Sequence, residues 1–239
     1  MEKFIIAGLK TKYHVRYDFL RKRSEAYKAD FNDEETEMII DVTDEMLMSK
    51  YEQAPLLDID KHEYVWTGQL FNRTLLEHNG MMVHSSCVEK DGKAYLFSAD
   101  SGTGKSTHTH LWLKNLSGTS LINDDKPALI LDDEIWYACG TPFSGKHDKS
   151  RNVKIPVRAI VFVERSETNY VEKISVAEAT KRLIKQTIRP IDMSLAYKML
   201  EKVDLLLRRV PVFLLHCNMD DEAAIVSYNG IERLINDED

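Results

Sequence analysis

The sequence predicts an α/β fold, a sheet flanked by helices, preceded by a small α+β extension. Its 239 residues suffice for one large α/β domain, or for one domain with a small appendage. Apolar residues make up 43% of the chain, which is enough for a proper core. A strand, a glycine-rich loop and a helix follow one another near residue 100, an order typical of α/β proteins.

Residues 1–62 are predicted to form the small N-terminal α+β segment. Residues 3–9 and 13–15 are expected to pair as opening strands, residues 37–42 to form another strand, and Thr43 to begin a helix. The run Arg21-Lys22-Arg23 is assigned to a solvated face, the alternative being a phosphate or partner patch.

Residues 63–239 are predicted to form the main domain, with a boundary near residue 62. Residues 55–62 are expected to be a connection, and residues 63–78 an amphipathic helix whose apolar stripe belongs to the core. Strands are then expected at residues 81–88 and 93–98, joined by the two-residue turn Asp91-Gly92. This turn pairs Lys90 with Lys93, so that paired residue numbers sum to 183.

The predicted register sets His84 opposite Ala99, where the glycine-rich loop begins. His84 is therefore either a site residue or a hydrogen-bonded imidazole of the core. The loop approximates the pattern G-x-x-x-x-G-K-[ST], with Ala99 at the first glycine position. Strand 93–98 precedes it and helix 106–116 follows it, the context that this pattern requires.

Each residue type in the loop suits phosphate chemistry. Glycines let backbone N–H groups approach phosphoryl oxygens, Lys105 can reach the β- and γ-phosphates, and the Ser106 hydroxyl can bind Mg²⁺. The helix directs its positive end at the anion. We therefore predict a nucleotide site made of Asp100, Ser101, Gly102, Thr103, Gly104, Lys105, Ser106 and Thr107.

Asp124 and Asp125 follow an expected strand at residues 119–123, and the carboxyl ends of strands carry the chemistry of open α/β sheets. Phosphoryl transfer needs a carboxylate for the metal and often a second one near the attacking hydroxyl. The alternative is an exposed turn, because Asp-Asp-Lys-Pro is also a turn sequence. A similar run at residues 132–134 is expected to be a hairpin tip.

The stretch from Gly140 to His147 matches G-x-x-x-x-G-K a second time. His147 replaces the metal-binding hydroxyl and no helical pattern follows, so we predict no second nucleotide site. A loop bearing Lys146, His147, Lys149 and Arg151 could close over an anionic substrate, or it could be a solvated connection.

The C-terminal part predicts strands at residues 157–164 and 210–216, and helices at residues 175–188, 193–209 and 220–236. Ser175 and Glu178 form the capping box of the first of these helices. His216 is expected to be structural. His108 and His110 are expected on the surface of the helix that follows Lys105, the alternative being that one of them contacts the nucleotide.

Composition narrows the function classes. The net charge is −7 with no basic block, which argues against a nucleic-acid binder. No apolar run is long enough for a signal peptide or a membrane span. Cys87, Cys139 and Cys217 lack metal-ligand spacing and indicate buried thiols in a reducing compartment, so a cytoplasmic protein without membrane partners is expected.

Together, His84, residues 98–106 and residues 121–125 resemble the catalytic domain of HPr kinase/phosphorylase, and the Ser-Gly-Thr-Gly-Lys core is similar to ATP-dependent phosphoenolpyruvate carboxykinase. The resemblance implies a P-loop-containing, phosphoenolpyruvate carboxykinase/HPr kinase-like mixed sheet. Its firm part spans residues 81–126, and the wider group includes kinases of free serine and of serine in small modified peptides. It also allows for a homo-oligomer, since HPr kinases form rings.

By position, the resemblance implies that Lys105 contacts the phosphates, that Ser106 and Asp125 hold Mg²⁺, and that Asp124 is the base. His84 would tune that pair, or bind a metal in a carboxykinase-like site. The chain departs from the family at Thr107, where HPr kinases have glutamate, and it lacks the downstream R-G-x-G signature. A carboxykinase is about twice this length.

The sequence hypothesis is thus an ATP- and Mg²⁺-dependent kinase acting on a serine-type hydroxyl of a peptide, small protein or small molecule. One alternative is a catalytically weak nucleotide-binding sensor or scaffold. The other is a carboxykinase-like phosphotransferase for small molecules. The loop pattern leaves ATP, ADP and pyrophosphate open as donors, because it recognises phosphates rather than a base.

Overall fold

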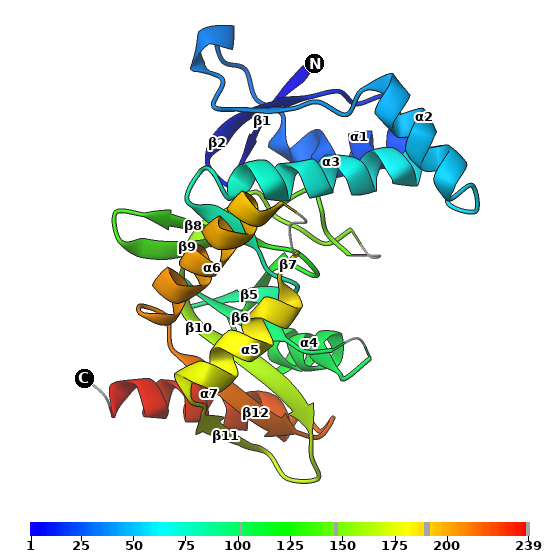
Figure 1. The fold of residues 1–239 in the computed structure, drawn as a ribbon. Helices are drawn as coiled ribbons and strands as arrows, with labels where there is room; N and C mark the ends of the chain where they lie inside the picture. Colours follow the sequence, from blue (N-terminus) through cyan, green and yellow to red (C-terminus); the bar gives the residue numbers. More distant parts are fainter. Residues whose placement is uncertain (101, 146–147, 189–191, 238–239) are drawn as a thin grey trace.

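The computed structural model describes residues 1–100, 102–145, 148–188 and 192–237 (Figure 1). It confirms an α/β architecture. A three-stranded sheet lies in the N-terminal part, and a larger mixed sheet carries helices on both of its faces.

The N-terminal sheet is built from an antiparallel hairpin of β1 (Glu2–Ile6) and β2 (Leu9–Tyr13), with β3 (Met38–Ile40) parallel to β2. The predicted strand limits were wrong here, because Ala7 and Gly8 adopt φ values of 55° and 83° and close a two-residue turn. Helix α1 (Asp18–Ser24), two 3₁₀ turns (Glu25–Tyr27 and Asp33–Glu35) and helix α2 (Asp44–Gln53) complete this part, and Thr43 caps α2 as predicted.

Helix α3 (Ile59–Leu75) contacts α1, α2 and β3 as well as β4 of the larger sheet. It begins four residues earlier than predicted and runs through residue 62, so a domain division there stays a prediction. One apolar cluster draws on both parts of the chain, among them Phe4, Leu20, Phe71, Ile130 and Phe143. The N-terminal segment therefore packs firmly against the rest of the molecule.

Strand β10 (Lys154–Arg165) is the centre of the larger sheet. Its beginning pairs antiparallel with β9 (Ile135–Cys139), and β8 (Ala128–Asp132) and β4 (Gly80–Met82) follow outward from there. Its remainder pairs parallel with β6 (Lys93–Ser98) and β12 (Val212–Cys217). Three strands join antiparallel to this second group: β5 (Ser86–Lys90), β7 (Ser120–Asn123) and β11 (Tyr170–Lys173).

The predicted hairpin register is confirmed from Ser86 to Phe97, but the predicted pairing of His84 with Ala99 is wrong, because β5 begins only at Ser86 and β6 ends at Ser98. Ser86 pairs with Phe97 and Lys90 with Lys93, while Asp91 and Gly92 take φ values of 53° and 72°. The continuous strand expected at residues 81–88 is wrong, because it is interrupted between β4 and β5. There the N–H groups of residues 83, 84 and 85 donate to the carbonyls of Pro127, Gln186 and Asp125 instead of a neighbouring strand.

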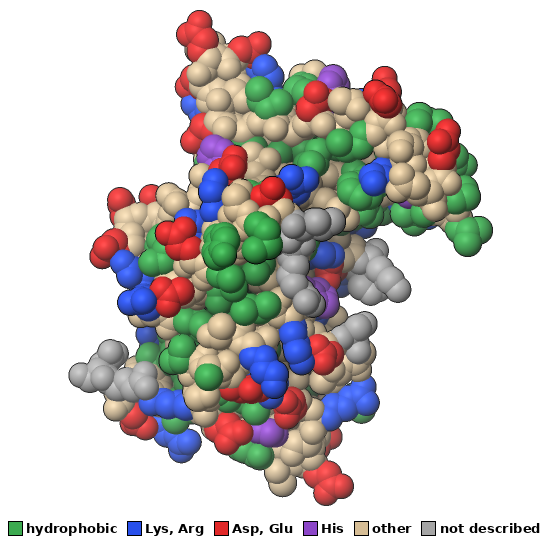
Figure 2. Space-filling view, in the orientation of Figure 1, with side chains coloured by type: hydrophobic (Ala, Val, Ile, Leu, Met, Phe, Trp, Pro, Cys, Tyr) green, Lys and Arg blue, Asp and Glu red, His purple; other side chains and the backbone are tan. Residues whose placement is uncertain are grey.

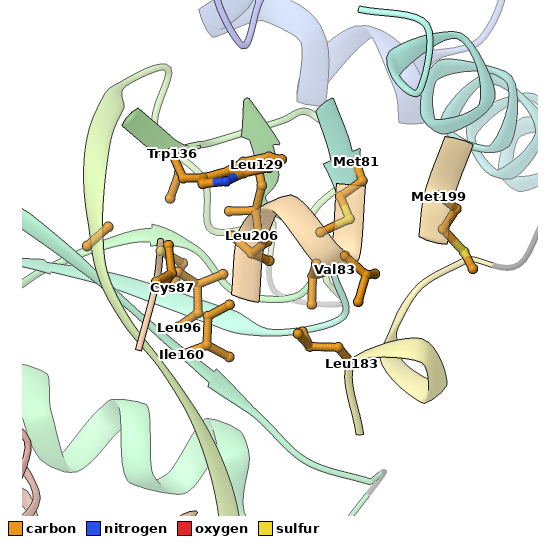
Figure 3. Close-up of a cluster of buried hydrophobic side chains, with 14 of the residues drawn as sticks. Met81, Val83, Cys87, Leu96, Leu129, Trp136, Ile160, Leu183, Met199 and Leu206 are labelled. Atoms are coloured by element: carbon orange, nitrogen blue, oxygen red, sulfur yellow. The ribbon is translucent and has the colours of Figure 1, made fainter. Parts of the chain in front are cut away.

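The sheet separates two hydrophobic layers. Helices α4 (Lys105–Asn115) and α7 (Glu222–Asn236) cover one face, where Tyr95 and Phe97 pack with Trp112. Helices α5 (Val176–Gln186) and α6 (Met193–Leu207) cover the other, where Leu96 packs with Leu183 and Leu206 (Figure 3). Because β6 is covered on both faces, its residues 94–97 are all apolar and buried.

Several smaller predictions can also be compared with the structure. Ser175 caps α5, but Glu178 pairs with Arg182 instead of closing the capping box. All three cysteines are buried and free. Apolar side chains gather over α6, where Met193, Tyr197 and Leu200 are exposed (Figure 2). Within the described ranges, every helix is too short or too polar to cross a membrane.

Candidate active site

A cavity of about 370 Å³ opens at the carboxyl ends of β6 and β7. It gathers most of the predicted site residues: His84, Asp100, Gly102, Gly104, Lys105, Ser106, Thr107, Asp124 and Asp125. Gly145, which lies far away in the sequence, completes the lining. Thr103 belongs to the same loop but lines two neighbouring cavities instead.

We call residues 99–100 and 102–104 the glycine loop. Gly102 and Gly104 have φ values of 80° and 124°, which a side chain would strain. Arg165 donates from Nε to the Thr103 carbonyl (3.0 Å) and from Nη2 to the Gly102 carbonyl. Helix α4 begins after Gly104 without a side-chain cap from the described residues. Its first-turn N–H groups are therefore available to an anion.

Lys105 extends from the start of α4 to His84, and its Nζ lies 2.7 Å from His84 Nε2. Burial lowers the pKa of Lys105 to about 8, although the charges of Asp125 and Asp124 act in the opposite direction. A negatively charged ligand in the cavity would favour the ammonium form.

The hydrogen-bond network determines which ring nitrogen of His84 carries a proton. Gln186 directs its Nε2 at Asp100 Oδ1 (3.2 Å), so its Oε1 faces His84 Nδ1 (2.9 Å), and Nδ1 must be the donor. His84 Nε2 also lies 3.1 Å from Asp125 Oδ1. A neutral imidazole thus accepts from Lys105 through Nε2, and a protonated one donates to Asp125.

Burial and hydrogen bonding act in opposite directions on the pKa of Asp125. Burial raises its pKa, but hydrogen bonds from His84 and Lys126 outweigh burial and hold the pKa well below the ordinary value. Lys126 Nζ lies 2.5 Å from Asp125 Oδ2. Asp125 is therefore ionised at neutral pH, as a metal-binding carboxylate must be.

Asp124 is held by a close backbone contact. The Gly145 N–H donates to Asp124 Oδ1 at 2.6 Å. A Cβ atom at residue 145 would lie 3.1 Å from both Asp124 Oδ2 and Asp125 Cβ, so only glycine fits without displacement.

Arg23 supports this contact from the N-terminal segment. Its guanidinium donates to the Gly145 carbonyl (3.2 Å) and the Ser144 hydroxyl (2.8 Å), and it lies 3.2 Å from Asp148 Oδ1. It also lies over the rings of Phe19 and Tyr64, at 4.5 and 4.9 Å. The solvated face predicted for Arg21-Lys22-Arg23 is therefore wrong for Arg23, whose side chain is only 6% exposed, although Lys22 is exposed.

Besides Thr103, four predicted site residues are not among the described residues that line this cavity. Ser101 of the nucleotide set, with Lys146 and His147, lies outside the described residues. Arg151 does not line the cavity, because its guanidinium binds the Leu121 carbonyl and Glu89.

The other histidines behave differently from one another. His108 is buried rather than on a helix surface, and its ring contacts the Ser227 hydroxyl (3.1 Å). His110 is exposed. His216 stacks on Tyr170 and pairs with Glu172, which agrees with the structural role expected for it.

Five residues of the site and its support escaped the sequence analysis: Arg23, Lys126, Gly145, Arg165 and Gln186. Two sequence features pointed near them: the basic run at residues 21–23, which contains Arg23, and the second G-x-x-x-x-G-K match, which contains Gly145. Lys126 contacts its own neighbour Asp125, whereas the contacts of the other four span up to 122 residues of sequence, which no local pattern encodes.

A metal ion at this site would need oxygen ligands from a bound phosphate compound or water in addition to those of the protein. Among the described residues, no group of three or more His, Cys, Asp or Glu side chains is placed to hold a metal ion. Asp125 and the exposed Ser106 nevertheless line the same cavity. This small donor set suits Mg²⁺, which is usually held by one or two carboxylates together with substrate phosphates and water.

No protein-family model and no curated protein matches the sequence. Among solved structures, the chain is similar to the Hpr(Ser) kinase/phosphatase from Coxiella burnetii, with a TM-score of 0.38 and 12% sequence identity. The similarity covers 66% of this chain and 92% of that chain, and it is distant.

Proposed function

We propose that this chain is an ATP- and Mg²⁺-dependent phosphotransferase that moves a phosphoryl group to a serine-type hydroxyl. One observation carries the proposal: Lys105, the uncapped start of α4 and the Asp124–Asp125 pair line a single cavity. The first two features attract a polyphosphate, and the carboxylates supply a proton acceptor and a metal ligand.

The glycine loop and α4 would bind the phosphates. Arg165 occupies two carbonyl groups of the loop, which favours an arrangement with the amides directed at the anion. Lys105 would add a cation at the β- and γ-phosphates, positioned by its contact with His84.

Asp125 and Ser106 are the residues that would hold Mg²⁺. Bound there, the metal would neutralise the charge that accumulates on the phosphates during transfer. A cation on Asp125 would take the place that the Lys126 ammonium holds beside Oδ2.

Asp124 would accept the proton of the acceptor hydroxyl. The hydroxyl oxygen forms the new bond to the γ-phosphorus, the bond from that phosphorus to the β–γ bridging oxygen breaks, and the electron pair leaves with ADP. The Gly145 N–H orients Asp124 for this role, and most of the catalysis would come from positioning and charge neutralisation.

The direct test is transfer of label from γ-labelled ATP·Mg²⁺ to three separate pools: free serine, serine-bearing peptides and a desalted cytosolic extract. We expect label in one pool, and its loss with Asp124→Asn. ATP binding without label in any pool would contradict the phosphotransferase and favour a nucleotide-binding sensor. Bicarbonate-dependent turnover of phosphoenolpyruvate would favour a carboxykinase-like enzyme instead.

A further inference from the structure

A second cavity of about 370 Å³ adjoins the candidate active site. Gly102, Gly104 and Thr107 line both cavities, so a single ligand could extend from one to the other across the glycine loop. The second cavity lies between the start of α4 and the carboxyl ends of β10 and β12, which run side by side (Figure 1).

The second cavity is weakly polar. Buried Val163 and Cys217 contribute to its lining, together with Met219, whose side chain is 77% exposed. Among the described residues that line it, only Arg165 carries a full charge, and its guanidinium is occupied by the loop carbonyls. The cavity therefore suits a flat, uncharged group rather than another anion.

A third cavity of about 220 Å³ borders the glycine loop at Asp100 and Thr103, and its character is opposite. Glu164, Glu178, Lys181, Arg182 and Lys185 all contribute to its lining. An uncharged aromatic group entering there would have to desolvate these charges. The second cavity is thus the better place for the uncharged part of a nucleotide.

His108 adds an independent observation in the second cavity. Ser227 Oγ donates to the Ala224 carbonyl and accepts from Trp112, so His108 Nε2 must donate to it. The proton therefore resides on Nε2, and Nδ1 is a bare acceptor. Nδ1 has no partner among the described residues, although His108 is only 2% exposed. A buried acceptor of this kind is unusual, and a donor on a ligand in the second cavity could satisfy it once the lining at His108 shifts.

We propose that the second cavity holds the nucleoside of the phosphoryl donor, with its base against Met219 and Val163 and an N–H or O–H group for His108. This inference rests on the proposed function, and it selects a nucleoside triphosphate over pyrophosphate or tripolyphosphate. The base would be recognised by contacts that the phosphates do not share.

The nucleoside cavity can be tested by measuring, by calorimetry, the affinity of the full chain for ATP·Mg²⁺ and for tripolyphosphate·Mg²⁺. We expect ATP to bind at least about tenfold more tightly, because the nucleoside adds apolar burial and a hydrogen bond. Met219→Ala should weaken ATP binding by about 5-fold, and Ser166→Phe, which fills the cavity, should remove the whole advantage. Both variants should keep the affinity for tripolyphosphate, which also shows that they fold. Met48→Ala, another exposed methionine, is the control.

The outcomes separate the two proposals. Equal affinities for ATP and tripolyphosphate, both abolished in Lys105→Ala, would leave the phosphate site intact and overturn the nucleoside cavity. A preference for ATP that survives Ser166→Phe would also overturn it. If neither ligand binds the unaltered protein, the proposed function itself fails.

Discussion

The candidate active site has two walls that are built in different ways. The glycine wall, made of β6, the glycine loop and α4, comes from one continuous stretch of chain, residues 93–115. The carboxylate wall consists of Asp124, Asp125 and Gly145, and it is held by Arg23 from the N-terminal segment. The first wall carries its chemistry in local sequence, whereas the second depends on contacts between distant segments.

The largest effect on activity is expected from removing Lys105, the cation of the glycine wall. Lys105→Ala should reduce phosphoryl transfer by at least ~100-fold, the scale of losing one preorganised electrostatic contact. Transfer of label from γ-labelled ATP measures this. Lys114→Ala, on the exposed end of the same helix, should retain activity. Full activity in Lys105→Ala would remove this wall from the mechanism.

The carboxylate wall should depend on Arg23, a residue of the N-terminal segment that is distant in sequence. Arg23→Ala removes the guanidinium that donates to the Ser144 and Gly145 carbonyls and to the Ser144 hydroxyl. The Ser144 carbonyl keeps the Tyr64 hydroxyl and the Gly145 carbonyl keeps the Asp148 N–H, but the loss of this buried charged donor should lower the free energy of unfolding by about 2–3 kcal/mol. Urea unfolding measures this loss.

Two variants sharpen the Arg23 comparison. Lys22→Ala, which removes the exposed neighbour, should change stability by less than about 0.5 kcal/mol. Arg23→Lys should restore only part of the loss, because an ammonium cannot bind several carbonyl oxygens as a planar guanidinium does. An unchanged unfolding midpoint in Arg23→Ala would show that the N-terminal segment does not support this wall.

A substitution at Gly145 should displace Asp124 directly, with a smaller expected effect. In Gly145→Ala the new Cβ, 3.1 Å from Asp124 Oδ2, should push the base by a few tenths of an ångström and reduce transfer by about tenfold. Gly230→Ala is a matched control, since its Cβ would lie 3.0 Å from Val171 at a distance from the site. Equal activities in the two variants would argue against a role for the Gly145–Asp124 contact.

The smallest expected effect tests the buried side of the glycine wall through pH. Burial lowers the pKa of His108 to about 4, whereas an unfolded histidine titrates near 6.5. Below pH 6.5 the unfolded chain binds a proton that the folded chain does not, so stability decreases as the pH falls. Between pH 7 and 5.5 this group should cost about 1 kcal/mol. Unfolding at several pH values should show the loss in the native chain and in His110→Gln, but not in His108→Gln.

The difference between the walls also explains which features the sequence could predict. The turn Asp91-Gly92 determines the β5–β6 register by local backbone preferences, and the prediction was confirmed from the pair Lys90–Lys93 to the pair Ser86–Phe97, where the ladder ends before His84. The glycine loop was likewise predictable from spacing, because its backbone requires glycine at residues 102 and 104.

Other features depend on interactions that are remote in sequence. The break at Val83–Ser85, which places His84 in the cavity, arises because three N–H groups bind carbonyls from other segments. The burial of Arg23 depends on the rings of Phe19 and Tyr64 and on a loop 121 residues away. Strand β11 is short and mostly exposed, and its four residues lack the apolar alternation that marks a strand.

Strand β10 has a consequence for how the molecule unfolds. Its first residues complete the antiparallel ladder with β9, and its later residues complete the parallel ladders with β6 and β12. Neither group of strands can therefore lose β10 without opening the other, which couples both halves of the sheet into one cooperative unit. The amide protons at its buried centre, residues 159–163, are expected to exchange with solvent only when the entire domain unfolds.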